Sequence, residues 1–390
     1  MHPDRTPAPS FHLSRGALEE VRTEFATAVR EGLARDGAEI AAFPAFLPPL
    51  PPHLAGWAIA VDVGGTHVRA ALVAHGPGGT RVEAGPISGP VVRGRPGAPV
   101  PCAAFFGCQA DLVASLAPPP GLPLGYCFSY PATVLPGGDA RLVRWTKGVE
   151  VVGVEGREVG ALLAGQLALR GVRVSGVRVL NDTVAVLLAG DPGPDARAVG
   201  LVAGTGTNMA ILAPAVPKVP DWNGPMAVNL ESGAFRPSHL TRWDEAVDAS
   251  SVDPGCQRFE KAVSGQYLPL LFRAASASPE RIGPGDGGEA LVRIRTGTPG
   301  EDADLAAAIL DRSADLVAAG LVAAADVLGG PPSVVAEGSL FWRSPGYRER
   351  VEGTARTLLG LPEGLSCTAV PDATLVGAAR AALLPRGGST

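Results

Sequence analysis

Residues 57–74 read WAIAVDVGGTHVRAALVA, and residues 198–213 read AVGLVAGTGTNMAILA. Each stretch is an apolar strand, a turn of Gly and Thr, and a second apolar strand. After Thr66 the side chains alternate in character, which is the period of a strand. The turn therefore differs from a dinucleotide fingerprint, in which the glycine-rich turn opens a helix. The domain-sized spacing between the two stretches predicts two related α/β halves.

The two glycine turns predict an anion-binding function. Glycine permits positive φ angles and a close approach of the backbone, so successive N–H groups can surround a phosphate. Asp62 stands just before the first turn, where a carboxylate can lie near a phosphate-bound metal. One such turn often binds nothing. Two matching turns, each with Thr, suggest one nucleotide held from both sides.

Composition excludes several classes of protein. The chain has 390 residues, of which 46% are hydrophobic and 18% charged, which suits two domains with buried cores. The net charge of −5 argues against a general nucleic-acid-binding protein and against a polybasic membrane protein. Five Cys without a C-x-x-C pair predict reduced thiols, not a disulfide framework or a zinc site.

The location of the protein is predicted from two further stretches. Residues 198–217 form a long uncharged run, but GTGTN and Pro217 do not suit a lipid-facing helix. The first residues, MHPDRTPAPSFHLS, lack the apolar segment of a signal peptide. We expect a soluble, cytoplasmic protein whose partners include neither membrane nor nucleic acid.

An acid and a lysine are the candidate catalytic groups. The stretch 173–190, RVSGVRVLNDTVAVLLAG, predicts a strand, then Asn181 and Asp182, then a helix over 182–189. An isolated Asp at a helix start is more often an N-cap than a catalytic group. Lys147 follows Trp145 in a loop and is one of only three lysines among 33 basic residues. A residue that is kept against such a bias is more often chemically needed.

The pattern of the chain also predicts its other elements. Helical spacing of apolar residues predicts helices, and clusters of Gly and Pro predict connections. The predicted helices cover 14–36, 155–170, 256–274, 303–328 and 373–384. We expect residues 43–53 to form an extended connector and residues 276–300 to form a surface loop.

Eight motifs in chain order resemble the hexokinase family, within the actin-like ATPase superfamily. They resemble, in turn, the first phosphate hairpin, the strand with a sugar-contacting Ser, the sugar loop with its helix, the catalytic-Asp stretch, the second phosphate hairpin, two Glu-bearing sugar segments and the adenosine region. The motifs are DVGGTHVR (62–69), GYCFSYP (125–131), RWTKG (144–148) with EGREV (155–159), VLNDTVA (179–185), VAGTGTNMAIL (202–212), NLESGAF (229–235), VDPGCQRFEKAVSGQYL (252–268) and VAEGSLFWRSPGY (335–347).

The resemblance implies a fold and a reaction. The fold is α/β, a two-domain actin-like ATPase (ribonuclease H-like) fold with an interdomain cleft that closes over the sugar. The small domain is expected at 57–180 plus 374–390, and the large domain at 14–56 plus 181–373. The reaction is ATP-dependent phosphorylation of the 6-hydroxyl of glucose, with mannose and fructose as further hexoses. ATP and Mg²⁺ are the implied cofactors.

The resemblance also implies a role for each matching residue. Asp182 is the general base for the sugar 6-hydroxyl, and Lys147 balances charge on the transferred phosphoryl group; both also contact the sugar. Mg²⁺ enters with ATP near Asp62 and Asp182, without a direct protein ligand. The other sugar contacts are Ser129, Thr146, Asn181, Asn208, Glu231 and Glu260. The nucleotide contacts are Asp62, Gly64, Gly65, Thr66 and Arg69 in the first hairpin, Gly204, Thr205, Gly206 and Thr207 in the second, and Gly338 with Ser339 at the adenosine.

The chain departs from the usual family pattern at four places. His67 stands where Asn is usual, Ser232 where Trp is common, and Glu337 where Asp is frequent. The stretch 371–379, PDATLVGAA, keeps Asp372 and Gly377 but lacks a GSGKG run.

Several alternative functions remain open. The protein could phosphorylate another hexose or an amino sugar, or use polyphosphate as donor. It could instead be a non-catalytic sugar sensor, which Lys147 and Asp182 argue against, or an actin-like filament protein, which Glu231 and Glu260 argue against. The open-reading-frame type of sugar kinase shares the DxGGT turn but carries a Cys-rich zinc segment that has no match here. Sugar preference and oligomeric state stay open.

Overall fold

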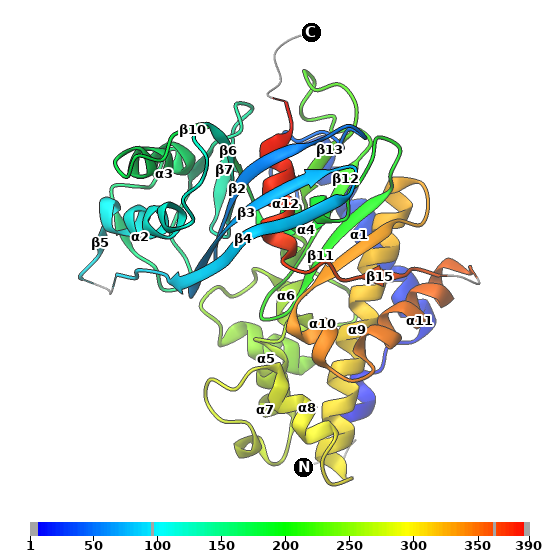
Figure 1. Ribbon diagram of the computed structural model, residues 1–390. Helices are drawn as coiled ribbons and strands as arrows, with labels where there is room; N and C mark the ends of the chain where they lie inside the picture. The colour runs from blue at the N-terminus through cyan, green and yellow to red at the C-terminus, as the bar shows by residue number, and fades with distance from the viewer. Residues whose placement is uncertain (1–6, 95–96, 362–363, 386–390) are drawn as a thin grey trace. The chain divides into compact units, whose positions relative to one another are not determined.

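The computed structural model describes residues 7–94, 97–361 and 364–385 (Figure 1). The chain is an α/β protein that divides by its packing into two units. Unit 1 consists of the described residues of Met1–Ala42, Arg197–Asn223 and Leu230–Ala369. Unit 2 consists of the described residues of Phe43–Ala196, Gly224–Asn229 and Val370–Thr390.

The division by packing differs from the predicted domains mainly at two stretches. Residues 43–56 and 181–196, which we expected in the large domain, pack within unit 2. The second stretch does so because it continues directly from a strand of the unit 2 sheet into a helix of the same unit. Residues 386–390 of the predicted small domain lie outside the described residues. The limits of the functional domains stay a prediction.

Unit 2 is built on a five-stranded sheet with the order β10-β6-β2-β3-β4. Strands β10, β6 and β2 run parallel, while β2, β3 and β4 form an antiparallel meander. The expected hairpin is confirmed, with β2 and β3 on either side of the first glycine turn. The bounds are β2 (Gly56–Val63), β3 (His67–Gly76), β4 (Gly79–Pro90), β6 (Leu122–Phe128) and β10 (Val174–Leu180).

Helices cover both faces of this sheet (Figure 1). Alternation along β2 sends Ile59, Val61 and Val63 into a core shared with α2 and α3. The helices of unit 2 are α2 (Cys102–Ser115), α3 (Val159–Ala168), α4 (Asp182–Ala189) and α12 (Ala373–Leu383). The small strands pair as β1 (Phe43–Pro44) with β13 (Met226–Asn229), β5 (Val100–Pro101) with β9 (Val151–Val152), and β7 (Ala132–Val134) with β8 (Ala140–Leu142).

Helix α12 packs closely against both the sheet and α4 because there is a glycine at each of the two contacts. Gly125 lies in the sheet, and Gly377 lies in α12 itself. A Cβ atom on Gly125 of β6 would lie 1.9 Å from the carbonyl oxygen of Ala378. On the other side of the helix, a Cβ atom on Gly377 would lie 1.8 Å from the carbonyl oxygen of Ala185. Neither position has room for a side chain, so two glycines set the distance from the sheet through α12 to α4.

Unit 1 combines a strand group with a long central helix. Strand β11 pairs antiparallel with β12 and parallel with β14, and β14 pairs parallel with β15. The second predicted hairpin is confirmed as β11 and β12. The strands are β11 (Ala198–Ala203), β12 (Thr207–Ala213), β14 (Ser333–Glu337) and β15 (Cys367–Thr368).

Helix α9 is the central helix of unit 1, and α1 and α11 pack against it. Arg22 of α1 forms a two-pronged ion pair with Asp326 of α9, with both distances 2.6 Å. The α-helices are α1 (Arg15–Ala34), α5 (Arg242–Ala249), α6 (Arg258–Val263), α7 (Leu268–Ala275), α8 (Gly288–Arg295), α9 (Glu301–Leu328), α10 (Ser339–Arg343) and α11 (Tyr347–Leu359). The short 3₁₀ helices are η1 (Ala8–Phe11), η2 (Ser232–Ala234) and η3 (Pro279–Arg281).

Two local predictions were wrong. Residues 256–274 do not form one helix, because the chain leaves α6 at Ser264 and resumes as α7 at Leu268. The break is stabilised by backbone hydrogen bonds from Gly265 and Gln266 to the second glycine turn. Residues 276–300 are not only a loop, since they contain α8, whose apolar side is buried against α7 and α9.

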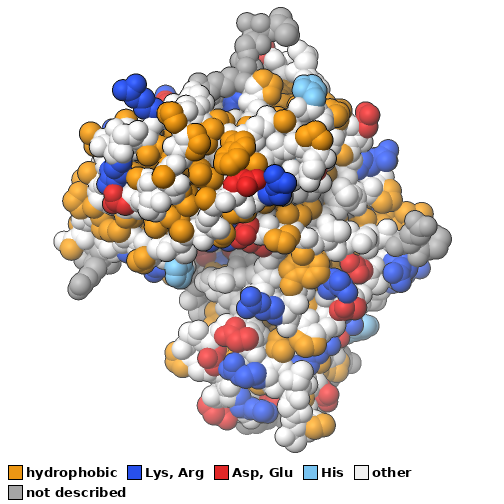
Figure 2. Space-filling model, in the orientation of Figure 1, with side chains coloured by type: hydrophobic (Ala, Val, Ile, Leu, Met, Phe, Trp, Pro, Cys, Tyr) orange, Lys and Arg blue, Asp and Glu red, His pale blue; other side chains and the backbone are white. Residues whose placement is uncertain are grey.

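The surface and the cysteines agree with the composition. Acidic and basic side chains lie interspersed around α7 and α8 and form no single-sign patch there (Figure 2). All five cysteines carry free thiols in the described structure. Among the described residues, none of the helices combines the length and apolar character needed to cross a bilayer.

Candidate active site

The first group of predicted site residues lies at one edge of the unit 2 sheet. In the parallel ladders, Leu180 of β10 pairs with Cys127 of β6, and Cys127 pairs with Asp62 of β2. The three strands therefore end at the same level. The residues that follow them share this edge, so Asn181, Ser129 and the first glycine turn lie near one another. The backbone N–H of Ser129 donates to the carbonyl of Val63 at 3.2 Å.

Asp182 is held at the start of α4. Asn181 is the N-cap, and its Oδ1 accepts the backbone N–H of Thr183 at 2.8 Å. Asp182 Oδ1 accepts the same N–H at 2.8 Å and the Thr183 hydroxyl at 3.2 Å. The N-cap role that competes with catalysis for an isolated Asp thus belongs to Asn181. The backbone N–H of Thr183 therefore holds the side chains of both Asn181 and Asp182.

Lys147 lies beside the first glycine turn. A Cβ atom on Gly65 would meet Lys147 Cδ at 3.0 Å. Lys147 has φ +58°, a left-handed conformation that is costly for a side-chain-bearing residue and typical of functional loops. Trp145 anchors this loop, since its indole N–H donates to Val151 at 3.1 Å and its ring packs edge-on against Phe105. Thr146 lies in the same loop, where its carbonyl accepts the N–H of Val149 at 3.1 Å.

Two side chains that were not among the predicted site residues hold the glycine turn. The Tyr130 hydroxyl donates to the Gly64 carbonyl at 2.7 Å, and Arg93 donates to the Gly65 carbonyl. Burial raises the pKa of Tyr130, so the phenol stays protonated and remains a donor. Lys147 Nζ lies 5.8 Å from the centre of the Tyr130 ring. The only sequence signal for Tyr130 was its position directly after Ser129.

Asp62 and Arg69 contact each other across the first hairpin. Arg69 Nη2 donates to Asp62 Oδ2 at 2.8 Å, and Arg69 Nη1 donates to Asp372 Oδ1 at 3.0 Å. The Thr374 hydroxyl also donates to Asp62 Oδ2, at 2.8 Å. The hairpin is thus tied to the first turn of α12. Thr66, in the turn itself, accepts the N–H of Val91 at 2.9 Å through its carbonyl.

The second group of predicted residues lies in unit 1, around the second glycine turn. The turn is closed by a hydrogen bond from the Gly204 N–H to the Gly206 carbonyl, at 2.9 Å. Glu260 of α6 approaches it closely, and its Oε1 accepts the N–H of Thr207 at 3.3 Å. A Cβ atom on Gly206 would lie only 2.7 Å from that oxygen. A side chain at this position would therefore displace the carboxylate from the turn.

Asn208 has a fixed amide orientation. Its Oδ1 accepts the backbone N–H of Met209 at 2.7 Å, the backbone N–H of Ser232 at 3.0 Å and the Ser232 hydroxyl at 3.3 Å. These three donors identify the oxygen end of the amide. Glu231, the residue before Ser232, has φ +55° and leads into η2.

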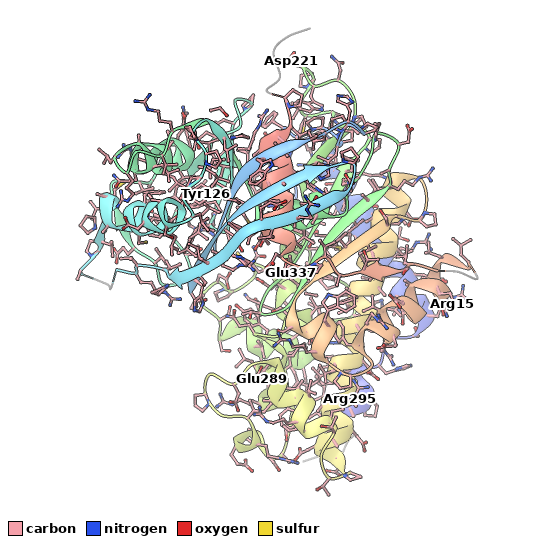
Figure 3. All side chains as sticks on the ribbon, viewed as in Figure 1. Arg15, Tyr126, Asp221, Glu289, Arg295 and Glu337 are labelled. Carbon is pink, nitrogen blue, oxygen red and sulfur yellow. The ribbon has the colours of Figure 1, made fainter. Side chains whose placement is uncertain are left out.

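Gly338 and Ser339 meet the same turn from β14. Glu337 ends this strand (Figure 3), and Gly338 follows with φ +124°. A Cβ atom on Gly338 would lie 2.1 Å from the carbonyl oxygen of Ala203, and one on Gly204 would lie 3.3 Å from Gly338 Cα. Ser339 begins α10. The segment predicted to border adenosine therefore packs directly on the second glycine turn.

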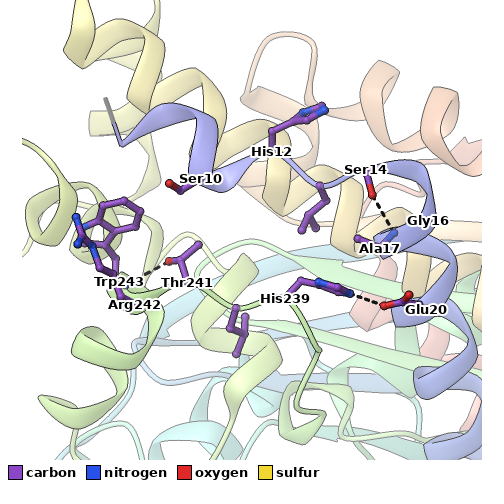
Figure 4. Close-up of a pocket in the computed structure, with 12 residues that line it drawn as sticks. Ser10, His12, Ser14, Gly16, Ala17, Glu20, His239, Thr241, Arg242 and Trp243 are labelled. Carbon is purple, nitrogen blue, oxygen red and sulfur yellow. Dashed lines mark hydrogen bonds and ion pairs between the residues drawn. The ribbon is translucent and has the colours of Figure 1, made fainter. Parts of the chain in front are cut away.

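A cavity of about 840 Å³ in unit 1 is lined by none of the predicted site residues (Figure 4). It lies between the segment that enters α1 and the segment that enters α5. His239 Nε2 and Glu20 Oε2 are hydrogen-bonded across it at 2.6 Å. Its lining side chains are mostly exposed, and we assign no function to it.

Comparison with known proteins identifies relatives for most of the chain. Two family models described as hexokinase match, one at residues 6–85 and 107–191 and the other at 198–278 and 303–384. Hexokinase-3 of Mus musculus is 31% identical over 285 residues, covering 69% of this chain and 30% of that protein. Hexokinase-1 of Saccharomyces cerevisiae is 39% identical over 169 residues, covering 39% and 34%. The matched parts span about a third of these relatives.

Solved structures of hexokinases are also similar to this chain. A hexokinase of Schistosoma mansoni, complexed with glucose, has a TM-score of 0.77 at 25% identity, covering 96% of this chain and 97% of that one. A ROK hexokinase of Thermus thermophilus has a TM-score of 0.52 at 16% identity, covering 84% of this chain and 98% of that one, which shows a common fold alone. The predicted actin-like ATPase fold is confirmed.

Proposed function

The chain belongs to the hexokinase family, and we propose that it transfers the γ-phosphoryl group of ATP to the 6-hydroxyl group of glucose. The observation that supports this most is the grouping at one sheet edge of unit 2. There a helix-start carboxylate, Asp182, lies at the same sheet edge as a glycine turn flanked by Lys147. A base, a cation and a phosphate-binding turn are the parts that phosphoryl transfer needs.

Asp182 is the proposed general base. A primary hydroxyl is a weak nucleophile, and a carboxylate within hydrogen-bond reach can take its proton as the phosphoryl group is transferred. Such a base contributes roughly 10²–10⁴ in rate. The hydrogen bonds from Thr183 hold this carboxylate in one orientation, which positions it before the substrate arrives.

Lys147 is the proposed cation for the transferred phosphoryl group. Its alkyl chain lies along Gly65, so its ammonium group belongs to the surroundings of the turn that we assign to the donor phosphates. Mg²⁺ usually keeps several of its waters and binds together with substrate phosphates, so Asp62 and Asp182 fit as nearby carboxylates for a metal that enters with ATP and has no direct protein ligand. When bound, Mg²⁺ would neutralise developing charge on the phosphates.

The unit 1 residues are the proposed contacts for sugar hydroxyls and for the nucleotide. Glu231, Glu260 and Asn208 supply carboxylate and amide groups, which reject analogues that leave them unpaired. The second glycine turn and Gly338 supply the second phosphate contact and the adenosine border. The free thiols of the five cysteines support a cytoplasmic location, where thiols stay reduced.

A coupled assay for ADP release tests this function. The purified chain is supplied with Mg²⁺ and ATP, and glucose, mannose, fructose or glucosamine is added in turn; polyphosphate replaces ATP in a parallel series. We expect glucose-dependent ADP release. The variant Asp182→Asn keeps the shape of the side chain but removes the base, so kcat should fall by about 10² or more.

The control is Asp195→Asn, the same chemical change at an exposed loop position of unit 2, which should leave kcat unchanged. Glucose binding without ADP release would favour a sensor, and release without sugar would favour an ATPase. Activity only with glucosamine or only with polyphosphate would assign the protein to one of the other kinase classes. Unchanged turnover in Asp182→Asn would remove this residue from the base role.

A further inference from the structure

Unit 1 contains a buried group of charged side chains that the proposed reaction does not use. Asp248 of α5 is 8% exposed, and its partners Arg258 and Lys261 of α6 are 3% and 4% exposed. Asp248 Oδ2 accepts Arg258 Nη1 at 2.8 Å, and Oδ1 accepts Lys261 Nζ at 2.7 Å. One carboxylate therefore binds two cations of the same short helix.

The partners of Lys261 leave its ammonium group no freedom. Besides Asp248, Nζ contacts the hydroxyl of Ser251 at 2.8 Å, the backbone carbonyl of Asp253 at 2.8 Å and the Asp253 carboxylate at 2.9 Å. An ammonium group has three protons, so all of its donors have acceptors within the protein. This lysine, one of three in the chain, thus acts on the protein and not on a ligand.

Charge keeps this cluster ionised at neutral pH. Burial alone would raise the pKa of Asp248, but hydrogen bonds from Lys261 and the Gly255 N–H, together with the two cations, hold its pKa below the usual value. Burial would lower the pKa of Lys261, yet its contacts with Asp248 and Asp253 raise it. Both groups therefore stay charged across the range in which a cytoplasmic enzyme works.

Glu260 lies on α6 between these two cations in sequence, and it contacts the second glycine turn. Its Oε1 accepts the N–H of Thr207. The chain that leaves α6 is attached to the same turn, because the Gly265 N–H donates to Gly204 at 2.8 Å and the Gln266 N–H donates to Thr205 at 3.1 Å. Helix α6 is thus fixed to Asp248 through its cations and to the glycine turn through its carboxylate and its C-terminal end.

We propose that Asp248 is a positioning residue that, through Arg258 and Lys261, holds Glu260 in place for the sugar. Buried ion pairs contribute little net stability compared with apolar packing, but each buried charge accepts few arrangements, so the cluster can specify one position of α6. The inference rests on the proposed function, in which Glu260 contacts hexose hydroxyls. Asp248 itself touches neither the predicted sugar residues nor the glycine turns through any contact described above.

The variant Asp248→Asn tests this role by removing the charge at nearly constant volume. We expect the KM for glucose to rise about tenfold or more, because small misplacements of a binding group are costly, with a smaller change in kcat. In a Glu260→Gln background the same substitution should add little to the glucose KM, because both act on one contact. Asp248→Glu, which restores the charge, should recover part of the glucose affinity.

The matched control is Glu245→Gln. Glu245 contacts Arg258 from the exposed side, with 54% of its side chain accessible, so the glucose KM should stay within about twofold of the original. If Asp248→Asn does not fold, Ser251→Ala removes only one acceptor of Lys261. That variant should raise the glucose KM about threefold, the effect of one hydrogen bond.

The possible failures are distinguishable. If the unmodified chain releases no ADP with any sugar, the proposed function fails. If the unmodified chain is active and a folded Asp248→Asn or Ser251→Ala variant shows an unchanged glucose KM, the positioning role alone is wrong. An effect of Asp248→Asn that adds in full to that of Glu260→Gln would also overturn it, because Asp248 would then act independently of Glu260. Circular dichroism and thermal unfolding establish that each variant is folded.

Discussion

Around the first glycine turn, residues 64–66, the surrounding groups are mostly charged and partly exposed. Asp62, Arg69 and Asp372 form an ion-paired group, and Lys147 lies against the turn. Around the second turn, residues 204–207, the surroundings are glycine and backbone, with the carboxylate of Glu260 as the one charged group described there. Gly338 contacts it where no Cβ would fit, and the chain after α6 is hydrogen-bonded to it. Two stretches with the same strand–turn–strand pattern are therefore held by different forces.

The comparison shows that the strand–turn–strand motif specifies its own backbone conformation, but not the contacts by which the rest of the protein holds the turn. Ion pairs near a surface weaken in salt and allow adjustment, whereas close packing at a glycine permits one arrangement. We therefore expect the first turn to respond to charge and ionic strength, and the second to respond to volume.

The largest effect is expected for Gly338→Ala at the second turn. The new Cβ would lie 2.1 Å from the Ala203 carbonyl oxygen, at φ +124°. Overpacking and backbone strain each cost about 1–3 kcal/mol, so unfolding free energy should fall by about 3 kcal/mol or more. Chemical denaturation measures this loss.

Gly360→Ala is the control for that prediction. Gly360 also has a positive φ, +65°, but a Cβ atom there would have open space. Its substitution should cost only the backbone strain, about 1 kcal/mol. Equal losses in the two variants would show that packing does not hold the second turn.

A smaller effect is expected for Arg69→Met at the first turn. The substitution removes the partner of Asp62 and Asp372 and should lower stability by about 1–2 kcal/mol, because these hydrogen bonds are charge-assisted but partly exposed. The KM for ATP should rise, and the difference from the unmodified chain should shrink at high salt. Arg81→Met, which changes an exposed arginine of the same unit, is the control. A defect in Arg69→Met that is insensitive to salt would contradict an electrostatic support.

The smallest effect is expected for a change of pH. It concerns the unfolding free energy of unit 1, which holds the second turn, and it is seen only in acid. Arg312 and other donors outweigh burial and lower the pKa of Asp244, and the pKa of Asp248 is lowered in the same way. Both carboxylates therefore stabilise the fold fully above the usual Asp pKa of about 3.9. Their contribution is lost as the pH falls through their lowered values.

Denaturant unfolding of the unmodified chain between pH 7 and pH 2.5 measures this dependence. Asp248→Asn, if folded, should lose part of it, since Asn does not titrate. An unfolding free energy that stays constant below pH 4 in the unmodified chain would contradict the assignment.

The local parts of the fold followed from the sequence. Glycine with alternating strands predicted both hairpins, and Asn181 with Asp182 was correctly expected at a strand–helix junction. These features depend on neighbours in the chain, which a sequence displays directly. The residues assigned to the site from family resemblance stay predictions, although the structure brings them into one group within each unit.

The predictions that were wrong or missing concern features that depend on contacts between residues far apart in the sequence. Residues 264–267 interrupt the expected helix, and the N–H groups of Gly265 and Gln266 bond a turn about 60 residues earlier. The cluster of Asp248, Arg258 and Lys261 was likewise missed, although the rarity of lysine marked Lys261. No local pattern tells a buried lysine from an exposed one when its partners lie on another helix.

Helix α12 has a consequence for the way in which the protein is made. The sheet of unit 2 leaves the ribosome early, yet the helix that packs on it at Gly125 comes from residues 373–383. Until synthesis reaches this helix, one apolar face of the sheet has no native cover and is available to chaperones or to other nascent chains. A messenger cut shortly before these codons should therefore yield an insoluble product instead of a slightly weaker enzyme.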